Sequence, residues 1–129
     1  MKKRILVVED DQAISKALMF RLSTAGYEVI SAFDAITGMA AAVKEEPDVA
    51  ILDISMPDGN GLDLAERMQK LGKTASLPFI VITASKKYSL RQRALDLGAR
   101  AFIEKPYDPE KLLGAVRECL GESPQPAGR

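Results

Sequence analysis

The stretch RILVVEDD, residues 4–11, runs four apolar residues directly into three carboxylates. A short run of Ile, Leu and Val with polar neighbours is typical of a buried strand. Glu9, Asp10 and Asp11 would then lie where that strand ends. Like charges so close together repel one another and raise each other's pKa. The cluster therefore requires either a compensating cation or full exposure to water.

Similar apolar runs recur along the chain, and segments with helical periodicity lie between them. The expected strands are residues 5–8, 29–32, 49–52, 79–82 and 101–103. In the first helical segment, apolar residues fall at i, i+3, i+4 and i+8, and these are Ile14, Ala17, Leu18 and Leu22. Gly26 follows where such a helix would stop.

Capping and breaking residues mark the other helices. The second helix is expected to be capped by Asp34 and to end near Pro47. The third is expected at residues 62–71, before Gly72, and the fourth is expected to end at Gly98. The last helix has Asp108 as N-cap, Pro109 at its first position and Gly121 just past its end. Near-continuous apolar strands that alternate with helices predict a parallel sheet covered on both faces, a doubly wound α/β fold.

Composition restricts the class of protein. With 129 residues, the chain has the size of one domain. Its 18 basic and 18 acidic residues cancel, so no global charge favours nucleic acid or a membrane surface. The single Cys119 cannot form an internal disulfide, and no apolar run reaches the length of a signal peptide or membrane span. We therefore expect a reduced, cytoplasmic protein with no direct nucleic-acid or membrane binding.

The chain contains no histidine, which removes the commonest general base and the commonest zinc ligand. Carboxylates, hydroxyls and lysines must therefore carry its chemistry. Residues 1–121 are expected to form the domain. The final stretch SPQPAGR has nothing apolar to bury, so residues 122–129 are expected to be a flexible tail or the start of a linker.

Polar residues follow four of the expected strands. In a doubly wound sheet, ligands bind outside the carboxyl ends of the strands. The residues at these ends are Glu9 and Asp10 after the first strand, Asp53 after the third, Thr83 after the fourth, and Glu104 and Lys105 at the fifth. Each has an ordinary explanation as a helix cap, a strand hydroxyl or a neutralising pair. Their shared position at one edge favours a site instead.

The charges at this edge suggest a metal. Glu9, Asp10 and Asp53 together are costly unless a hard divalent cation and Lys105 share the site. Ligands that are all oxygen favour Mg²⁺ over zinc. A carboxylate beside Mg²⁺ and an ammonium can attack phosphorus, and a threonine hydroxyl could bind one of the phosphoryl oxygens. Asp11 is better interpreted as a helix cap.

Other interpretations of this edge are weaker. The EDD turn would repel a nucleotide phosphate, and Gly59 with Gly61 supplies only a fragment of a glycine-rich motif. These glycines more plausibly shape the loop after Asp53. A Mg²⁺ phosphatase that recycles an aspartyl intermediate is chemically close. It normally needs a lid, for which this chain has little spare length.

At these motifs the chain resembles the receiver domain of two-component response regulators. The resemblance covers residues 5–120 and rests on ILVVEDD (5–11), AILDISMPDGNG (50–61), IVITA (80–84) and FIEKP (102–106). It implies a single flavodoxin-like (βα)5 domain whose parallel strands have the order 2-1-3-4-5. By position, it makes Asp53 the phosphoacceptor.

The resemblance also implies roles for the neighbouring residues. Glu9, Asp10, Asp53 and the backbone carbonyl of Ser55 would bind Mg²⁺, Thr83 and Phe102 would be the switch residues, Lys105 would contact the phosphoryl group, and the Lys105–Pro106 bond would be cis. Without the resemblance, Phe102 would be expected to be core and the bond trans.

The implied function is a transient switch. A phosphohistidine on a sensor histidine kinase or histidine phosphotransfer protein would dock near the first helix and phosphorylate Asp53. Thr83 and Phe102 would then shift the surface formed by helix 4, strand 5 and helix 5 until the acyl phosphate hydrolyses. Such a domain catalyses only its own phosphorylation and dephosphorylation. The alternative is a pseudo-receiver that binds partners without phosphorylation, although the chain retains every chemical residue.

Overall fold

The computed structural model describes residues 2–55 and 61–122 and contains one five-stranded parallel sheet. Its strands are β1 (Arg4–Val8), β2 (Glu28–Ala32), β3 (Val49–Asp53), β4 (Phe79–Thr83) and β5 (Ala101–Glu104). Its helices are α1 (Gln12–Thr24), α2 (Ala35–Glu45), α3 (Gly61–Lys70), α4 (Tyr88–Asp96) and α5 (Pro109–Cys119). The strand order is β2-β1-β3-β4-β5, so the expected doubly wound fold and strand order are confirmed.

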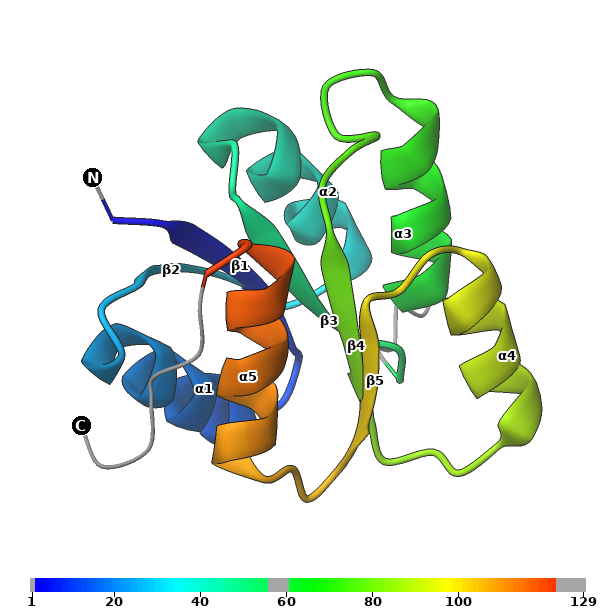
Figure 1. The fold of residues 1–129 in the computed structure, drawn as a ribbon. Helices are drawn as coiled ribbons and strands as arrows, with labels where there is room; N and C mark the ends of the chain where they lie inside the picture. Colours follow the sequence, from blue (N-terminus) through cyan, green and yellow to red (C-terminus); the bar gives the residue numbers. More distant parts are fainter. Residues whose placement is uncertain (1, 56–60, 123–129) are drawn as a thin grey trace.

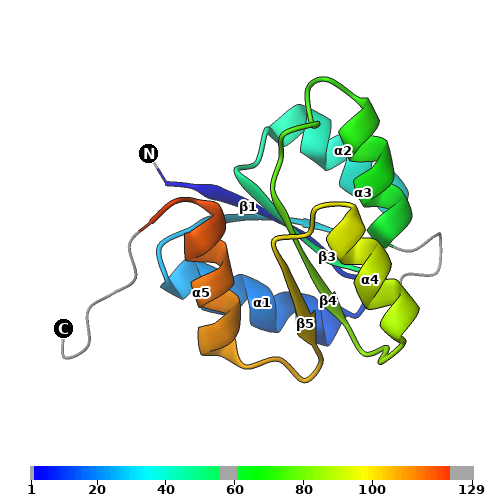
Figure 2. The same cartoon turned by 45° about the vertical axis from the view of Figure 1, so that its right-hand side comes forward.

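The helices cover both faces of the sheet. Helices α1 and α5 lie on one face and α2, α3 and α4 on the other (Figure 1, Figure 2). Because successive residues of a strand point to opposite faces, β1 contributes to both cores. Ile5 and Val7 pack with α1 and α5, whereas Leu6 and Val8 pack with the other three helices. Burial on both faces explains why the strands read as unbroken apolar runs.

The expected helix caps are confirmed. Asp11 accepts a hydrogen bond from the Ile14 N–H at 3.0 Å, and Asp108 accepts one from the Glu110 N–H at 3.0 Å. Asp34 forms a reciprocal capping box with Thr37. These short side chains satisfy N–H groups that the first turn of a helix leaves free.

All five strands are one residue longer than expected: β1 and β2 begin one residue earlier, and the other three end one residue later because their final polar residues still pair. Asp53 lies opposite Ile82, and Thr83 lies opposite Glu104. The third helix begins and ends one residue early, at Gly61 and Lys70.

Of the expected tail, only Glu122 lies within the described residues. It accepts a hydrogen bond from the Tyr27 hydroxyl at 2.7 Å and is therefore held against the domain. Within residues 2–55 and 61–122, no helix combines the length and apolar character needed to cross a bilayer.

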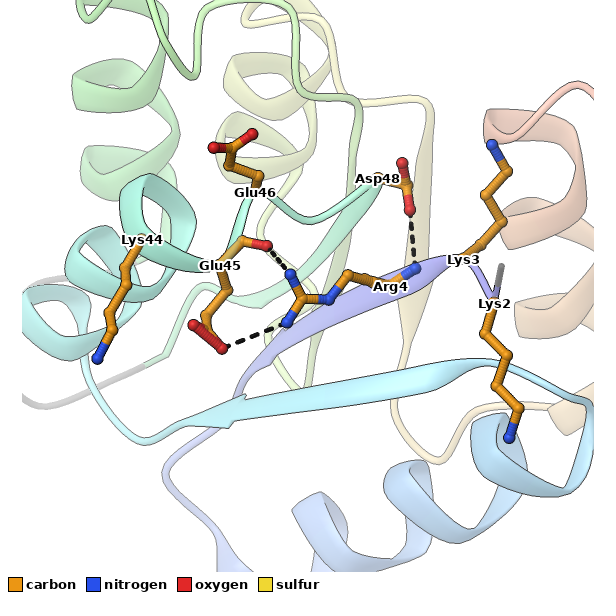
Figure 3. Close-up of a pocket in the computed structure, with 7 residues that line it drawn as sticks. All are labelled: Lys2, Lys3, Arg4, Lys44, Glu45, Glu46 and Asp48. Atoms are coloured by element: carbon orange, nitrogen blue, oxygen red, sulfur yellow. Dashed lines mark hydrogen bonds and ion pairs between the residues drawn. The ribbon is translucent and has the colours of Figure 1, made fainter.

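A cavity of about 510 Å³ lies beside the amino ends of β1 and β3 (Figure 3). Its centre is Arg4, whose guanidinium donates to the backbone carbonyl of Glu45 and lies 3.3 Å from the Glu45 carboxylate. The Arg4 N–H donates to Asp48 at 2.8 Å. The guanidinium also lies 3.5 Å from Glu28. Arg4 thus pairs with Glu28 and Glu45, so we interpret this part of the cavity as a structural junction of β1, β2 and α2.

We expect Arg4→Ala to lower the free energy of unfolding by about 1–2 kcal/mol, because a half-buried carbonyl at the end of α2 loses its donor. Lys73→Ala is the matched control, because Lys73 pairs with Glu46 at 3.5 Å and both side chains are more than half exposed. That change should stay within about 0.5 kcal/mol. Urea denaturation measures both. Equal effects would contradict the structural role of Arg4.

Candidate functional site

The acidic residues and the lysine meet at the carboxyl edge of the sheet. Glu9 follows β1, Asp53 ends β3, and Lys105 follows β5. The Lys105 ammonium lies 2.7 Å from Glu9 Oε1 and 3.1 Å from Asp53 Oδ2. Carboxylate oxygens of Glu9, Asp10 and Asp53 all lie within 4.8 Å of one another. The structure thus brings together four of the five charged residues predicted at the strand ends.

Burial makes the negative charges of this cluster costly. Glu9 is fully buried and Asp53 is 2% exposed, whereas Asp10 faces solvent. Burial, followed by a hydrogen bond with Asp53, raises the pKa of Glu9 to about 7. Burial opposes the charge of Lys105, but the adjacent carboxylates of Glu9 and Asp53 outweigh it and raise the pKa of the ammonium. Two buried carboxylates therefore pair with Lys105, and the exposed carboxylate of Asp10 lies close to both.

Glu9 Oε1 shows that the cluster is incompletely satisfied. This oxygen is buried without a hydrogen bond of acceptable geometry, although Lys105 Nζ lies 2.7 Å away. The short distance reflects the attraction of charges rather than a well-aligned hydrogen bond. A buried carboxylate oxygen that lacks a directed partner, beside two further carboxylates, matches the all-oxygen ligand set of Mg²⁺. The residues present therefore fit this metal.

The Asp53 carboxylate is held in a defined orientation. Its Oδ1 accepts the Ser55 N–H at 2.9 Å, which forms a tight turn after β3. Its Oδ2 faces Lys105. One carboxylate oxygen is thus fixed by the backbone while the other faces the ammonium, which suits a nucleophile with a fixed direction of approach.

Thr83 forms hydrogen bonds that sequence reasoning missed. Its hydroxyl is fully buried, accepts the Ser85 N–H at 3.0 Å, and shares a 3.2 Å hydrogen bond with the Ser55 hydroxyl. The sequence suggested Ser55 only as a backbone ligand. Serine two residues after both Asp53 and Thr83 was the available signal, because neighbouring parallel strands carry such residues to the same edge.

The remaining expected residues lie around this centre. Phe102 is half-buried against the core, and the Arg91 guanidinium lies 5.7 Å from the centre of its ring. The Lys105–Pro106 peptide bond is cis in the structure. Asp11 caps α1 and donates its N–H to Glu9 Oε2 at 3.2 Å, so its backbone, rather than its carboxylate, contacts the acidic cluster.

Gly61 also reaches the site from α3, whereas Gly59 lies outside the described residues. A Cβ atom at Gly61 would lie 2.6 Å from the carbonyl oxygen of Asp53. The expectation that this glycine shapes the chain after Asp53 agrees with that close approach.

Comparisons with known proteins agree with this geometry. The family model described as the response regulator receiver domain matches residues 5–117. The chain is 37% identical over 117 residues to the DNA-binding dual master transcriptional regulator RpaA of Synechocystis sp., an alignment that covers 91% of this chain and 48% of RpaA. The chain thus spans about half the length of the curated relatives it matches.

Solved structures show the same fold. The CheY-like response regulator receiver domain protein of Methanospirillum hungatei has a TM-score of 0.87 and 36% identity, with 94% of this chain and 95% of that one covered. The receiver domain of sensor histidine kinase PA1611 from Pseudomonas aeruginosa, with a magnesium ion coordinated in its active site cleft, has a TM-score of 0.85 and 22% identity. That alignment covers 95% of this chain and all of the other.

Proposed function

The chain belongs to the response regulator receiver domain family, and on that premise we propose that Asp53 accepts a phosphoryl group and thereby switches the domain. The observation that carries the proposal is the contact between Lys105 Nζ and Asp53 Oδ2 at 3.1 Å within a cluster of three carboxylates. An ammonium there can bind the oxygens of a phosphoryl group as it moves onto the aspartate.

Asp53, Lys105 and Thr83 would each have a different role in phosphoryl transfer. A carboxylate oxygen of Asp53 attacks phosphorus while the donor keeps the electrons of the bond that breaks. The Lys105 ammonium moves from the Asp53 carboxylate to a phosphoryl oxygen. The Thr83 hydroxyl donates a hydrogen bond to a second phosphoryl oxygen. Because Phe102 and Thr83 lie on neighbouring strands, a movement of Thr83 can change the space open to the aromatic ring. The surface of α4, β5 and α5 then shifts.

Mg²⁺ is the cofactor we propose for this centre. Glu9, Asp10 and Asp53 would bind it through carboxylates, and Ser55 through its backbone carbonyl. The bound ion would neutralise charge on the phosphoryl oxygens. The unsatisfied Glu9 Oε1 supports this assignment. The PA1611 receiver domain, which shares the fold, holds magnesium in its active site cleft.

The proposal extends to partners and surroundings. The donor would be a phosphohistidine on a sensor histidine kinase or histidine phosphotransfer protein, since the chain has no histidine of its own. We assign residues 1–121 to the receiver domain, with Glu122 held against it by Tyr27, and the residues that follow to a tail or the start of a linker. The zero net charge supports a role without direct nucleic-acid or membrane contact, and we propose a cytoplasmic location.

Intact-mass spectrometry tests this function. After incubation with Mg²⁺ and acetyl phosphate, we expect one phosphoryl adduct that depends on the metal, decays on standing and maps to the peptide containing Asp53. Absence of the adduct would favour a pseudo-receiver. Continued hydrolysis of acetyl phosphate beyond one equivalent per protein, without accumulation of the adduct, would favour a phosphatase.

Metal affinity should depend on pH, because a metal ion must displace the proton of Glu9. With the pKa of Glu9 raised to about 7, affinity should increase as the pH rises through 7. We expect binding about tenfold weaker at pH 6 than at pH 8, since one unit below the pKa leaves about a tenth of the groups ionised. Calorimetry in two buffers would also detect the released proton. Glu9→Gln should bind weakly and without this pH dependence; an unchanged profile in that variant would contradict the assignment.

A further inference from the structure

Among residues 2–55 and 61–122, the buried hydroxyl of Thr83 has two hydrogen-bond partners. A hydroxyl offers one proton and two lone pairs. The Ser85 N–H occupies one lone pair, at 3.0 Å. The other contact within the described chain is the Ser55 hydroxyl, at 3.2 Å. Since Thr83 is fully buried, its proton needs an acceptor, and the Ser55 oxygen is the acceptor that the structure offers.

We propose that Ser55 is a positioning residue, whose hydroxyl accepts the Thr83 proton in the unphosphorylated domain and thereby opposes phosphorylation-dependent switching. This inference rests on the proposed function of Asp53 and Thr83. Thr83 has a single proton, so it cannot donate to Ser55 and to a phosphoryl oxygen at once. The two acceptors compete for it.

Ser55 is connected to the phosphoacceptor as well as to Thr83. Its N–H donates to Asp53 Oδ1 at 2.9 Å, while its hydroxyl reaches Thr83. It therefore links the end of β3 to the end of β4. Any displacement of Asp53 Oδ1 during phosphorylation changes the anchor of the Ser55 backbone, and hence the position of the competing hydroxyl.

Loss of the hydrogen bond between Ser55 and Thr83 costs Ser55 less than it costs Thr83. Ser55 is solvent-exposed, so after Thr83 leaves, its hydroxyl can bind water. Thr83 is buried and has no such substitute. Losing the Ser55 acceptor therefore destabilises the unphosphorylated state more than the phosphorylated one, in which a phosphoryl oxygen takes over.

Ser55→Ala tests this competition, with Mg²⁺ and beryllofluoride as a stable phosphoryl analogue. We expect the apparent Kd for beryllofluoride to fall about three- to tenfold, the range for loss of one hydrogen bond. In the unliganded chain, the Thr83 methyl resonance should move toward its position in the liganded wild type. Ser55→Thr should restore the acceptor and reverse much of both changes.

Two further variants separate positioning from a general structural effect. Ser85→Ala removes the other nearby serine hydroxyl but keeps the backbone N–H that Thr83 uses, so the Thr83 resonance should not move. In a Thr83→Ala background, Ser55→Ala should no longer change the affinity. An unmoved Thr83 resonance in Ser55→Ala, or an effect that persists without Thr83, would overturn the inference. Failure of the wild type to bind beryllofluoride would count against the proposed function, and a Thr83 methyl resonance that is unmoved in unliganded Ser55→Ala would still rule out the hydrogen bond with Ser55.

Discussion

Asp53→Asn should abolish the Mg²⁺-dependent phosphoryl adduct and should also make the metal-free domain more stable. The loss of function follows from chemistry, since an amide oxygen is not a nucleophile toward phosphorus under these conditions. The gain in stability follows from electrostatics. The variant keeps an oxygen that can accept the Ser55 N–H but removes one of the three clustered carboxylates, two of which pair with Lys105.

The expected gain is about 1–2 kcal/mol at pH 8 in the presence of a chelator, by relief of repulsion between buried like charges. The sign depends on pH. Glu9 has a folded pKa of about 7, above its ordinary value of 4.5, so its contribution to stability is complete below pH 4.5 and is lost as the pH rises through 7. Asp53→Asn should reduce that loss. Its advantage should therefore be smaller at pH 5.5 than at pH 8.

Urea denaturation at the two pH values and intact-mass spectrometry measure the two effects. Asp11→Asn is a suitable control, because it removes a nearby charge while asparagine keeps the cap of α1. That variant should still form the adduct. An adduct that survives Asp53→Asn would identify another acceptor. A loss of stability at pH 8 would mean that the ion pair with Lys105 outweighs the repulsion.

Most of the fold follows from local patterns. Apolar runs identified every strand to within a residue or two, and short polar side chains marked the caps of α1, α2 and α5. The ends of β3 and β4 were missed because Asp53 and Thr83 are polar, yet both stay in the ladder. Hydrophobicity cannot show that a functional side chain completes a buried strand.

The gathering of the charged residues was predictable, whereas their detailed hydrogen bonding was not. Parallel strands place their carboxyl ends together, so the cluster of Glu9, Asp53 and Lys105 follows from topology. The hydrogen bond between Ser55 and Thr83 depends on side-chain rotamers across two loops, and no sequence period encodes these. The Arg91 contact with Phe102 is equally non-local, since it joins α4 to β5.

Gly61 is a position where fold and site depend on the same contact. It begins α3 and lies against the end of β3. A methyl group there would lie 2.6 Å from the carbonyl oxygen of Asp53 and 3.2 Å from the Cβ of Leu52. Both neighbours belong to a strand buried on both faces, so neither can move away as a flexible side chain could.

We expect Gly61→Ala to lower the free energy of unfolding by about 2–3 kcal/mol, the upper part of the usual range for overpacking, because the contact is rigid. Gly114→Ala is the matched control, because Gly114 lies within α5 and a methyl group there meets nothing within 4 Å. That change should instead stabilise the domain by about 0.5–1 kcal/mol through helix propensity. Urea denaturation of both variants measures the opposite signs.

The same substitution should also affect the site, because the backbone that must yield at position 61 is that of Asp53. In folded Gly61→Ala, the phosphoryl adduct should therefore form at least several-fold more slowly, since small displacements of a nucleophile are costly in rate. Gly114→Ala should form the adduct at the wild-type rate. If Gly61→Ala were as stable and as reactive as Gly114→Ala, then α3 would not pack against Asp53 as closely as the structure shows. A variant that is destabilised but fully reactive would mean that the strain is relieved by movement of α3, and that the orientation of Asp53 depends instead on Ser55 and Lys105.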